Sequence, residues 1–323
     1  MRVLEIGDHY VSDFIKDENE NRKKYSLDLH LDTRLGAVRL HGLAPADTMW
    51  GQYWYRSGIN ASMTKELQGI VAEVTSRVKL KDDDIWLDIA CNDGTLLKAV
   101  PDNLNKVGID PCDDSFYAES SKVATVVQDY FSKDAWKKTK FADKKAKVIT
   151  CIAMFYDLDN PHPFVKDLYN VLHDDGTLVL QMSYTPLMIK QMAFDNICHE
   201  HVYYYDLNSI QTLFSQHGFR IVDCSLNDTN GGSFRIYLQK DIAEVSSFAK
   251  NTCWNSQSII PLSKRLVFFR TSRNIKSISL MSKPISSLIS RRAPYIIDSP
   301  AMTWPATDTS HNPGKVCLFK LRF

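Results

Sequence analysis

An alternation of β-rich and helical segments between residues 65 and 184 constrains the fold more than any other feature. Five apolar runs have the length of single buried strands: IWLDIAC (85–91), KVGID (106–110), ATVVQDYF (124–131), KVITCIAMF (147–155) and TLVLQMSY (177–184). Helical periodicity precedes the first run at 65–80 and separates the last two at 163–176, where the predicted helix ends at a glycine. Alternating strands and helices predict a parallel sheet covered on both faces.

A predicted hairpin completes the sheet. A helix over 208–218 is followed by FRIVDCSL (219–226) and SFRIYLQK (233–240), with the turn-rich NDTNGG between them. The hairpin adds antiparallel strands to the five parallel ones and gives an α/β, mixed seven-stranded sheet within 85–240. This strand count resembles the Rossmann-like fold of class I methyltransferases.

The turn after the first strand is the expected cofactor site, because ligands of open α/β sheets bind at the carboxyl ends of strands. WLDIACNDGTLL places Asp88 on the strand and small residues, Ala90, Asn92 and Gly94, in the turn. Asp110 ends the second strand, where a carboxylate can accept hydrogen bonds from ribose hydroxyls. A tight turn in which Asp88 caps backbone amides is the alternative interpretation.

The turn favours S-adenosylmethionine over a dinucleotide. Its single glycine departs from the G-x-G-x-x-G pattern, and a cofactor without a pyrophosphate does not need three glycines. Gln128 and Asp129, after the third strand, are candidates to meet the adenine, although a solvated loop explains them equally well.

The densest polar cluster is AFDNICHEHVYYYDL (193–207), after the fifth strand. His199, Glu200 and His201 suit proton transfer, because histidine titrates near neutral pH and glutamate can orient it. The H-E-H spacing lacks the i, i+4 relationship that places two metal ligands on one helical face. A structural role for His199 remains open.

With these segments the chain resembles the sugar C-methyltransferases that act on nucleotide-linked 4-keto-deoxysugars. The resemblance covers roughly residues 25–240 and rests on YWYRSGINASM (53–63), LDIACNDGTLL (87–97), MFYDLDNPHPFVKDLYNVLHDDG (154–176), SYTPLMIKQMAFDNICHEHVYYYDL (183–207) and NGGSFRIYLQK (230–240). It implies that His201 removes the proton next to a ketone, with Glu200 and His199 beside it, so that the carbon can take the methyl group.

The resemblance also implies roles for residues on either side of this element. A lid over cofactor and sugar would consist of Tyr53, Tyr55, Arg56 and Ser57, with Tyr55 and Ser57 toward the cofactor. The acceptor would be contacted by Tyr53, Arg56, Asn196, Gly232 and Arg235.

Three departures from the family pattern stand out. Many members have tyrosine before H-E-H, where this chain has Cys198. Members usually carry a cysteine-bound zinc module, but here no cysteine precedes Cys91, and Asp32 and Leu35 stand where a pair is expected. We therefore expect no metal, and an irregular N-terminal arm over 1–64. Members also continue into a second domain with a glycine-rich G-A-S-x-K-G-N segment, and nothing similar follows 245.

Charge marks a further boundary. The chain carries +1 overall, which favours neither nucleic acid nor a membrane surface as partner, yet residues 245–323 carry +10 and the remainder −9. We predict an S-adenosylmethionine-dependent methyltransferase domain over 65–244 and a divergent, basic, serine-rich tail over 245–323. A frame-shifted remnant and a diverged segment that packs on the domain both explain such a tail.

The sequence therefore predicts a cytoplasmic C-methyltransferase that uses S-adenosylmethionine and a small-molecule acceptor, a nucleotide-linked sugar. Seven unpatterned cysteines indicate reduced thiols, and no export signal or membrane segment is recognisable. Two alternatives remain: a methyltransferase that acts on O or N of another small molecule, and an inactive truncated relative that still binds the cofactor.

Overall fold

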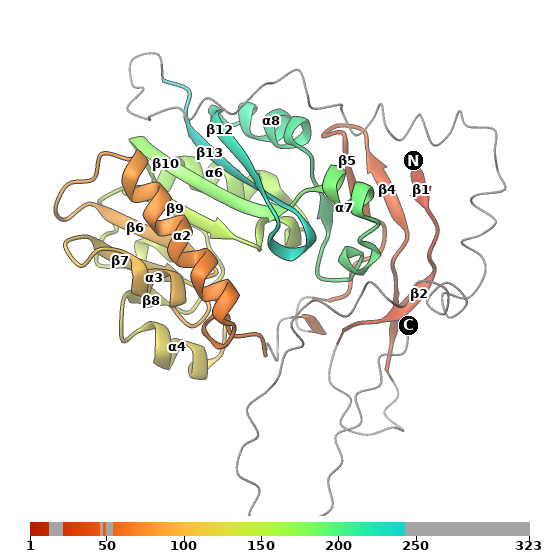
Figure 1. Cartoon of the computed structure of the whole chain (residues 1–323), viewed down its shortest axis with the longest axis horizontal. Helices are drawn as coiled ribbons and strands as arrows, with labels where there is room; N and C mark the ends of the chain where they lie inside the picture. Colours follow the sequence, from red (N-terminus) through yellow and green to blue (C-terminus); the bar gives the residue numbers. More distant parts are fainter. Residues whose placement is uncertain (13–21, 46–47, 50–53, 243–323) are drawn as a thin grey trace, which may run out of the picture. The chain divides into compact units, whose positions relative to one another are not determined.

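The computed structural model describes residues 1–12, 22–45, 48–49 and 54–242. Tyr53 and the tail after 242, both subjects of sequence predictions, lie outside these residues, so the expected tail over 245–323 and its boundary stay predictions. The described chain contains a seven-stranded sheet with helices on both faces and a smaller sheet that joins the N-terminal residues to the segment after H-E-H (Figure 1).

The large sheet has the order β12-β13-β10-β9-β6-β7-β8. Its strands are β6 (Ile85–Ile89), β7 (Asn105–Ile109), β8 (Thr125–Val127), β9 (Ala146–Ile152), β10 (Leu172–Ser183), β12 (Phe219–Asn227) and β13 (Ser233–Lys240). The strands from β6 to β10 pair in parallel, whereas β13 is antiparallel to both β10 and β12. The predicted five parallel strands, the hairpin and the mixed sheet of the class I methyltransferase fold are confirmed.

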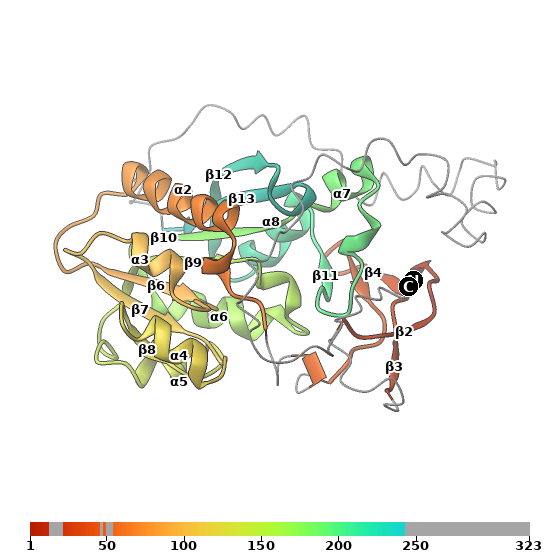
Figure 2. The same ribbon diagram turned by 60° about the horizontal axis from the view of Figure 1, so that its bottom comes forward.

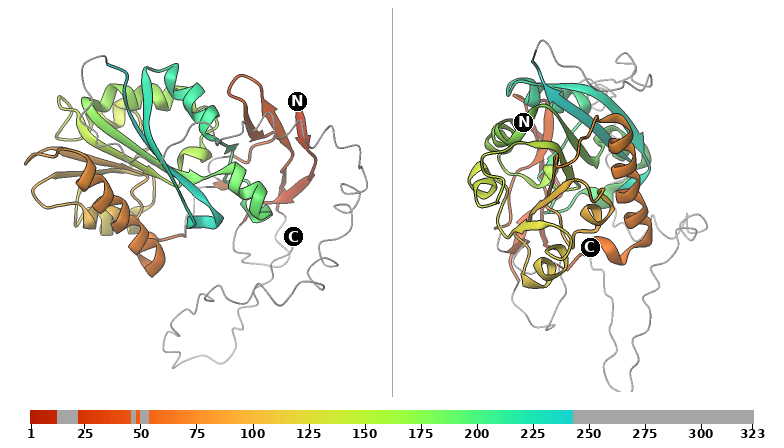
Figure 3. Two further views of the ribbon diagram at one scale, coloured as in Figure 1. Left: turned by 45° about the horizontal axis from the view of Figure 1, so that its top comes forward. Right: turned by 90° about the vertical axis from the view of Figure 1, so that its left-hand side faces the viewer.

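Helices cover both faces of this sheet. They are α2 (Ala61–Arg77), α3 (Thr95–Ala99), α4 (Asp114–Ser120), α5 (Lys133–Lys137), α6 (Pro161–Val171), α7 (Thr185–Gln191) and α8 (Leu207–Ser215). The side chains of successive strand residues point to opposite faces, so Trp86 packs with α2 and α3 while Leu87 packs in the core with α6 and α8. Figure 2 shows α2 and α6 on opposite sides of the sheet, and Figure 3 shows the β12–β13 hairpin beside β10.

Several predicted helix ends differ from the structure, and α2 and α8 end about three residues earlier than expected. The side chain of Asn60 accepts hydrogen bonds from the amides of Ser62 and Met63, so α2 begins four residues earlier than expected. Helix α6 ends at Val171 instead of Gly176, because Leu172 is already extended and begins β10. Gly176 serves a close approach instead: a Cβ there would lie 3.0 Å from the carbonyl oxygen of Lys147 on β9.

The expectation of an irregular N-terminal arm is wrong for much of residues 1–45. The strands β1 (Arg2–Leu4), β4 (Leu29–Asp32) and β5 (Ala37–Leu40) pair with β11 (Tyr203–Tyr204) in the order β1-β4-β5-β11, and β2 (Asp8–Tyr10) pairs with β3 (Lys24–Ser26). These strands have only two to four residues, too few for a recognisable period-2 pattern. Their partners are distant in sequence, and β11 directly follows H-E-H.

Candidate active site

The turn after β6 takes the left-handed backbone conformation at three alternate positions. The φ angles are 58° at Ala90, 52° at Asn92 and 76° at Gly94. Left-handed φ values favour glycine, and asparagine tolerates them better than other side chains, so Ala90 is the strained member of the three. Gly94 is also needed for space, since a Cβ there would lie 3.0 Å from the Cα of Ser120.

The two predicted carboxylates near this turn, Asp110 and Asp88, have different hydrogen-bond partners. Asp110 lies at the end of β7, where its Oδ2 accepts a hydrogen bond from the Asn92 amide at 2.7 Å and its Oδ1 accepts one from the Cys112 amide at 2.8 Å. Asp88 is only 4% exposed, and its Oδ1 accepts a hydrogen bond from the Thr150 hydroxyl at 2.6 Å. Burial raises the pKa of Asp88 to about 7, and the charge of Asp110 adds to this.

Both carboxylates are buried, but Asp88 is bonded within the sheet to Thr150, whereas Asp110 follows β7 and holds an amide of the turn. An ionised carboxylate has about four acceptor positions, and the amides of Asn92 and Cys112 use two of those on Asp110. The remaining positions suit two ribose hydroxyls, so the residues present fit the ribose end of S-adenosylmethionine. The role of Asp88 as a direct cofactor ligand stays a prediction.

Asn92 connects the turn to the chain before α2. Its Oδ1 accepts a hydrogen bond from the Ser57 amide at 3.0 Å, and its Nδ2 donates one to the Tyr55 carbonyl at 2.9 Å. The Gly58 amide donates to Asp93 Oδ2 at 2.8 Å. The structure thus brings Tyr55 and Ser57 to the predicted cofactor turn.

Two further predicted residues lie beside this edge. Arg56 donates a hydrogen bond from Nη2 to the Ser115 hydroxyl at 2.6 Å, and its guanidinium lies 4.0 Å from the ring centroid of Phe116. Gln128 donates to the carbonyl of Cys112 at 3.2 Å, so it borders the loop that holds Asp110. Both contacts of Arg56 are with residues of α4. The role of Arg56 in binding the acceptor stays a prediction.

The second half of the site is the H-E-H segment, where His201 has a defined orientation. Its Nδ1 lies 3.0 Å from the carbonyl oxygen of Asn196. A carbonyl only accepts, so Nδ1 carries the proton and Nε2 is the basic nitrogen. Burial lowers the pKa of His201, although Asn196 and Glu200 oppose this shift. The neutral imidazole therefore has one free base position.

The two histidines of the segment have different surroundings. His199 is 4% exposed, and its Nε2 donates a hydrogen bond to the carbonyl of Tyr25 at 3.0 Å. This contact ties H-E-H to β3 in the N-terminal region, as the pairing of Tyr203 with Arg39 ties β11 to β5. The predicted catalytic role of His199 stays open, and the contact with Tyr25 favours a structural one.

Residues after β9 contribute to the acceptor side, which the sequence did not indicate. The short 3-10 helix η2 (Phe155–Asp157) brings Tyr156 against His201, with ring centroids 4.2 Å apart. Glu200 Oε2 and Asp157 Oδ1 are both buried without a hydrogen-bond partner. The rule that ligands bind at the carboxyl ends of strands could have identified FYD, because these residues begin three positions after the end of β9.

The predicted acceptor residues divide into two groups. Asn196 is buried, accepts a hydrogen bond from the Ser183 hydroxyl at 3.2 Å, and lies close to the Gly231–Gly232 turn. Arg235 belongs to an ion-pair network, in which Nε donates to Gln181 at 2.8 Å and the other two nitrogens contact glutamates of α2, namely Glu66 and Glu73. Each of the three guanidinium nitrogens thus has a partner within the protein, and an acceptor contact by Arg235 stays a prediction.

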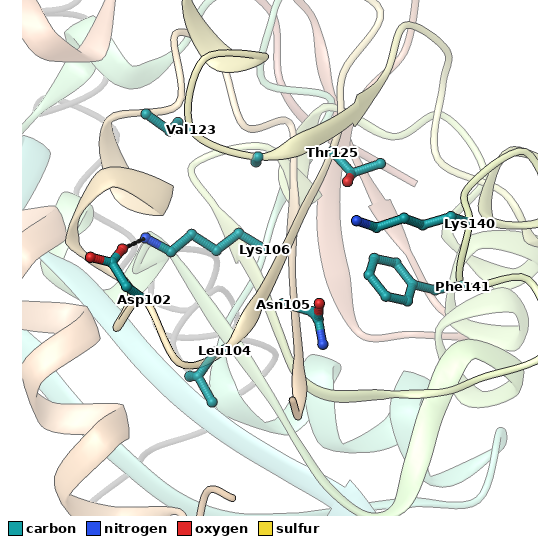
Figure 4. Close-up of a pocket in the computed structure, with 9 residues that line it drawn as sticks. Asp102, Leu104, Asn105, Lys106, Val123, Thr125, Lys140 and Phe141 are labelled. Atoms are coloured by element: carbon teal, nitrogen blue, oxygen red, sulfur yellow. Dashed lines mark hydrogen bonds and ion pairs between the residues drawn. The ribbon is translucent and has the colours of Figure 1, made fainter. Parts of the chain in front are cut away.

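A cavity of about 310 Å³ lies at the amino ends of β7 and β8, whereas the site described above lies at the carboxyl ends of the strands. Figure 4 shows its lining, in which Lys106 is paired with Asp102 at 2.7 Å. The cavity is distant from the carboxyl ends of the strands, so it is separate from the site described above.

Within the described ranges, no three His, Cys, Asp or Glu side chains are grouped to hold a metal ion. None of the helices described is long and apolar enough to cross a membrane.

Comparison with known proteins places this site in a known family. Residues 61–223 match the family described as methyltransferase domain. The chain is 23% identical over 230 residues to the C-methyltransferase NovU of Streptomyces niveus, which covers 71% of this chain and 55% of that protein. The chain thus spans about half the length of this curated relative.

Solved structures include two similar chains. An S-adenosylmethionine-dependent methyltransferase from Clostridium acetobutylicum is 12% identical, covers 55% of this chain and 92% of its own, and has a TM-score of 0.42. The YcgJ protein from Bacillus subtilis is 14% identical, covers 55% and 99%, and also has a TM-score of 0.42. The family match extends over half of the sequence and includes the turn after β6. The chain belongs to the methyltransferase domain family.

Proposed function

We propose that the protein methylates a carbon atom next to a ketone, on a nucleotide-linked keto-sugar. The methyl donor is S-adenosylmethionine, as the sequence predicts. The orientation of His201 carries the proposal: Nδ1 is held by the Asn196 carbonyl and Nε2 is left as a base. Carbon must lose a proton before it can take a methyl group, whereas many O and N acceptors need no such strong assistance. The 23% identity to NovU supports the same acceptor chemistry.

In this mechanism Nε2 of His201 removes the proton beside the carbonyl, and the electron pair forms an enolate. When bound, S-adenosylmethionine would supply the electrophilic methyl group, carried on its sulfonium, that the enolate carbon needs. His201 then carries the proton as an imidazolium, next to Glu200. Asp110 would hold the ribose, and the hydrogen bonds of Asn92 to residues 55–57 would keep that segment at the cofactor.

The proposal is tested by proton exchange in deuterated water. Wild-type protein, mixed with S-adenosylhomocysteine and a nucleotide-linked 4-keto-deoxysugar, is expected to incorporate deuterium at the carbon next to the ketone. His201→Asn should slow this exchange by about 10²–10⁴. Asp110→Ala is the matched control, because it weakens cofactor binding and leaves the base in place. Methylation of an O or N acceptor without carbon exchange would replace the proposal, and cofactor binding without any turnover would indicate an inactive relative.

We also propose that the protein works in the cytoplasm. The five cysteines within the described residues are all free thiols, and three of them, Cys112, Cys198 and Cys224, are only partly buried. Free thiols persist in reducing compartments, whereas oxidising ones favour disulfides. Fractionation of the producing cells tests this, and recovery of the protein outside the cytoplasm would contradict it.

A further inference from the structure

Gln181 is a buried amide within the apolar strand β10. It lies on the face of the sheet that packs with α2, like Val179 two positions earlier, and it is only 3% exposed. A glutamine amide has one oxygen that accepts hydrogen bonds and two N–H groups that donate them. A buried polar group of this kind destabilises the fold unless it has partners, so the contacts of Gln181 indicate what the residue does.

The hydrogen bonds of Gln181 determine the orientation of its amide. Its Oε1 accepts from Arg235 Nε at 2.8 Å and from Asn227 Nδ2 at 3.1 Å, while its Nε2 donates to Glu66 Oε1 at 3.0 Å. A guanidinium only donates and a carboxylate only accepts, so the amide oxygen and nitrogen cannot be exchanged without the loss of these bonds. Gln181 thus connects three elements, namely β13, the end of β12 and α2.

Asn227 continues this contact to the turn between β12 and β13. Its Oδ1 accepts a hydrogen bond from the Thr229 amide at 3.0 Å. The Thr229 carbonyl accepts one from the Gly232 amide at 3.0 Å and one from the Ser233 hydroxyl at 2.8 Å. We call residues 229–232 the acceptor turn, because the sequence predicts that Gly232 contacts the acceptor. Gln181 is therefore hydrogen-bonded to the side chain that holds this turn.

Glu66 fastens the same network to α2. Its Oε1 also accepts a hydrogen bond from Arg235 Nη2 at 2.6 Å, while Arg235 Nη1 contacts Glu73 further along the helix. Gln181 and Arg235 lie directly opposite each other in the pairing of β10 with β13, so both are on the face that α2 covers. Charge-assisted hydrogen bonds, in addition to apolar packing, therefore hold α2 on the sheet.

The N-terminal end of α2 is attached to the turn after β6. Just before the helix, the Ser57 amide donates to Asn92 Oδ1 at 3.0 Å, and the Gly58 amide donates to Asp93 Oδ2 at 2.8 Å. Two residues separate Gly58 from the beginning of α2. A shift of α2 on the sheet therefore moves residues 57–58 relative to the turn that fits the cofactor.

We propose that Gln181 is a positioning residue that connects the acceptor turn with the turn after β6, through Asn227 on one side and through Glu66 and α2 on the other. When the cofactor orders residues 57–58, α2 is held more firmly, and the hydrogen bonds of Gln181 pass this restriction to the acceptor turn. Methyl transfer needs both reactants in contact, and a misplacement of about 1 Å slows such reactions strongly. The effect on methylation rests on the proposed function, whereas the connection between the two turns does not.

The first test does not depend on activity. Amide hydrogen exchange of the whole chain is measured with and without S-adenosylhomocysteine. In the wild type we expect the ligand to slow exchange at residues 57–58 and, by about tenfold, in the acceptor turn. Gln181→Met keeps the length of the side chain but has no amide, so the slowing in the acceptor turn should fall below about twofold while that at 57–58 remains. Equal slowing of the acceptor turn in both proteins, or none in the wild type, would overturn the proposal.

Gln239 offers a matched control on the same sheet. It is also a buried glutamine, 2% exposed, but its Nε2 reaches only the Thr177 hydroxyl at 3.4 Å, and its Oε1 has no hydrogen-bond partner within the described residues. Gln239→Met should therefore keep the effect of the ligand on the acceptor turn. If both methionine variants lose this effect, the cause is a general loosening of the sheet and the proposal fails.

Asn227→Ala provides a second variant in case Gln181→Met does not fold. It removes the contact between Gln181 and the acceptor turn without placing a new side chain in the core. The ligand should then slow exchange at residues 57–58 but no longer in the acceptor turn. Ligand-dependent slowing of the acceptor turn that persists in Asn227→Ala would contradict the proposed connection.

Kinetics separate positioning from a general structural role. Asn227→Ala should raise KM for a nucleotide-linked 4-keto-deoxysugar about tenfold and leave Kd for S-adenosylhomocysteine near the wild-type value. Glu66→Ala should do the reverse, with a Kd about tenfold higher and a KM near the wild-type value. Gln181→Met should raise both constants. A fall in kcat alone, of the same size in all three variants, would overturn the positioning role.

The two proposals can fail separately. If the wild-type protein methylates no keto-sugar, the proposed function fails, while the exchange measurements still decide whether Gln181 connects the two turns. If methylation occurs but the acceptor turn does not respond to S-adenosylhomocysteine, the proposed function stands and the role of Gln181 is refuted.

Discussion

The phenol ring of Tyr156 lies against the imidazole of His201, with ring centroids 4.2 Å apart and ring planes inclined by 57°. Tyr156 follows β9, and His201 belongs to the segment before β11, so this contact joins two loops at the same edge of the sheet. Together with the hydrogen bond from Nδ1 to Asn196, it fixes where Nε2 can point. A base held from two sides loses little entropy when it meets its substrate.

Removal of this ring should damage turnover more than removal of its hydroxyl. Tyr156→Ala takes away a buried ring, with an expected loss of stability of about 3–5 kcal/mol and a fall in kcat of up to about 10². Tyr156→Phe keeps the ring and should retain most of the packing. Melting curves and kcat of the two variants, measured below the melting point of Tyr156→Ala, check this. Equal kcat values in both variants would show that the ring does not position His201.

His201 should govern the acidic limb of the pH–rate profile. A base acts in its neutral form, and burial lowers the pKa of His201, so the acidic limb should lie at a lower pH than for an ordinary histidine. His201→Asn should lower kcat by about 10²–10⁴ and abolish this limb, while the affinity for S-adenosylmethionine stays near normal. Kinetics across pH and calorimetry with the cofactor test both statements. An unchanged pH–rate profile in His201→Asn would show that another residue acts as the base.

Asp110→Ala should weaken binding of S-adenosylmethionine by about 1.5–3 kcal/mol, because the ribose hydroxyls lose a charged acceptor. The amides of Asn92 and Cys112 lose theirs as well, so the turn itself should loosen. Calorimetry with cofactor and with S-adenosylhomocysteine measures the loss, and Asp143→Ala serves as an exposed control. Tight binding of NAD(H), with none of S-adenosylmethionine, would refute the cofactor assignment.

Backbone conformation predicts opposite changes in stability for substitutions at Ala90 and Gly94. Ala90→Gly should stabilise the protein by about 0.5–1 kcal/mol, because glycine relieves the strain of φ 58° at a smaller entropic cost. Gly94→Ala should destabilise it by about 2 kcal/mol, since a φ of 76° and the contact with Ser120 both disfavour a Cβ. Gly69→Ala in α2 is the control: no atom lies within 4 Å, and helix propensity should add about 0.5–1 kcal/mol. Denaturant titration measures all three, and a stabilising Gly94→Ala would contradict the argument.

The ion pair of Arg77 with Asp223 fastens α2 to the edge strand β12, with a distance of 2.6 Å and side chains only 7% and 4% exposed. Asp223→Ala leaves the buried guanidinium with Glu73 as its remaining ion-pair partner, and should cost up to about 3 kcal/mol of unfolding free energy. Asp241 makes a solvent-exposed pair with Arg220 at 4.0 Å, so Asp241→Ala should change stability by less than about 1 kcal/mol. Chemical denaturation compares the two, and similar small losses would show that burial does not matter here.

The elements of the large sheet could be predicted from the sequence because their signals are local. Apolar runs of strand length, helical periodicity and the turn NDTNGG each depend on neighbouring residues, and their order implied a parallel sheet with an antiparallel hairpin. The same order placed Asp110 and His201 at the carboxyl edge, since all parallel strands end there. Helix ends were less predictable: at Gly176 the pairing of β10 with β9 replaced the expected helix end.

Tertiary structure alone decided what surrounds each functional side chain. The short N-terminal strands form by pairing with one another and with β11, far along the chain, so no local pattern indicates them. Arg235 lies in an ion-pair network because alternate residues of β13 face α2, a consequence of strand register. Tyr156 meets His201 only through the packing of η2 against H-E-H. A sequence determines which groups are present, whereas burial, neighbouring charges and hydrogen-bond partners depend on the packing of distant segments, and they set the pKa and orientation of His201.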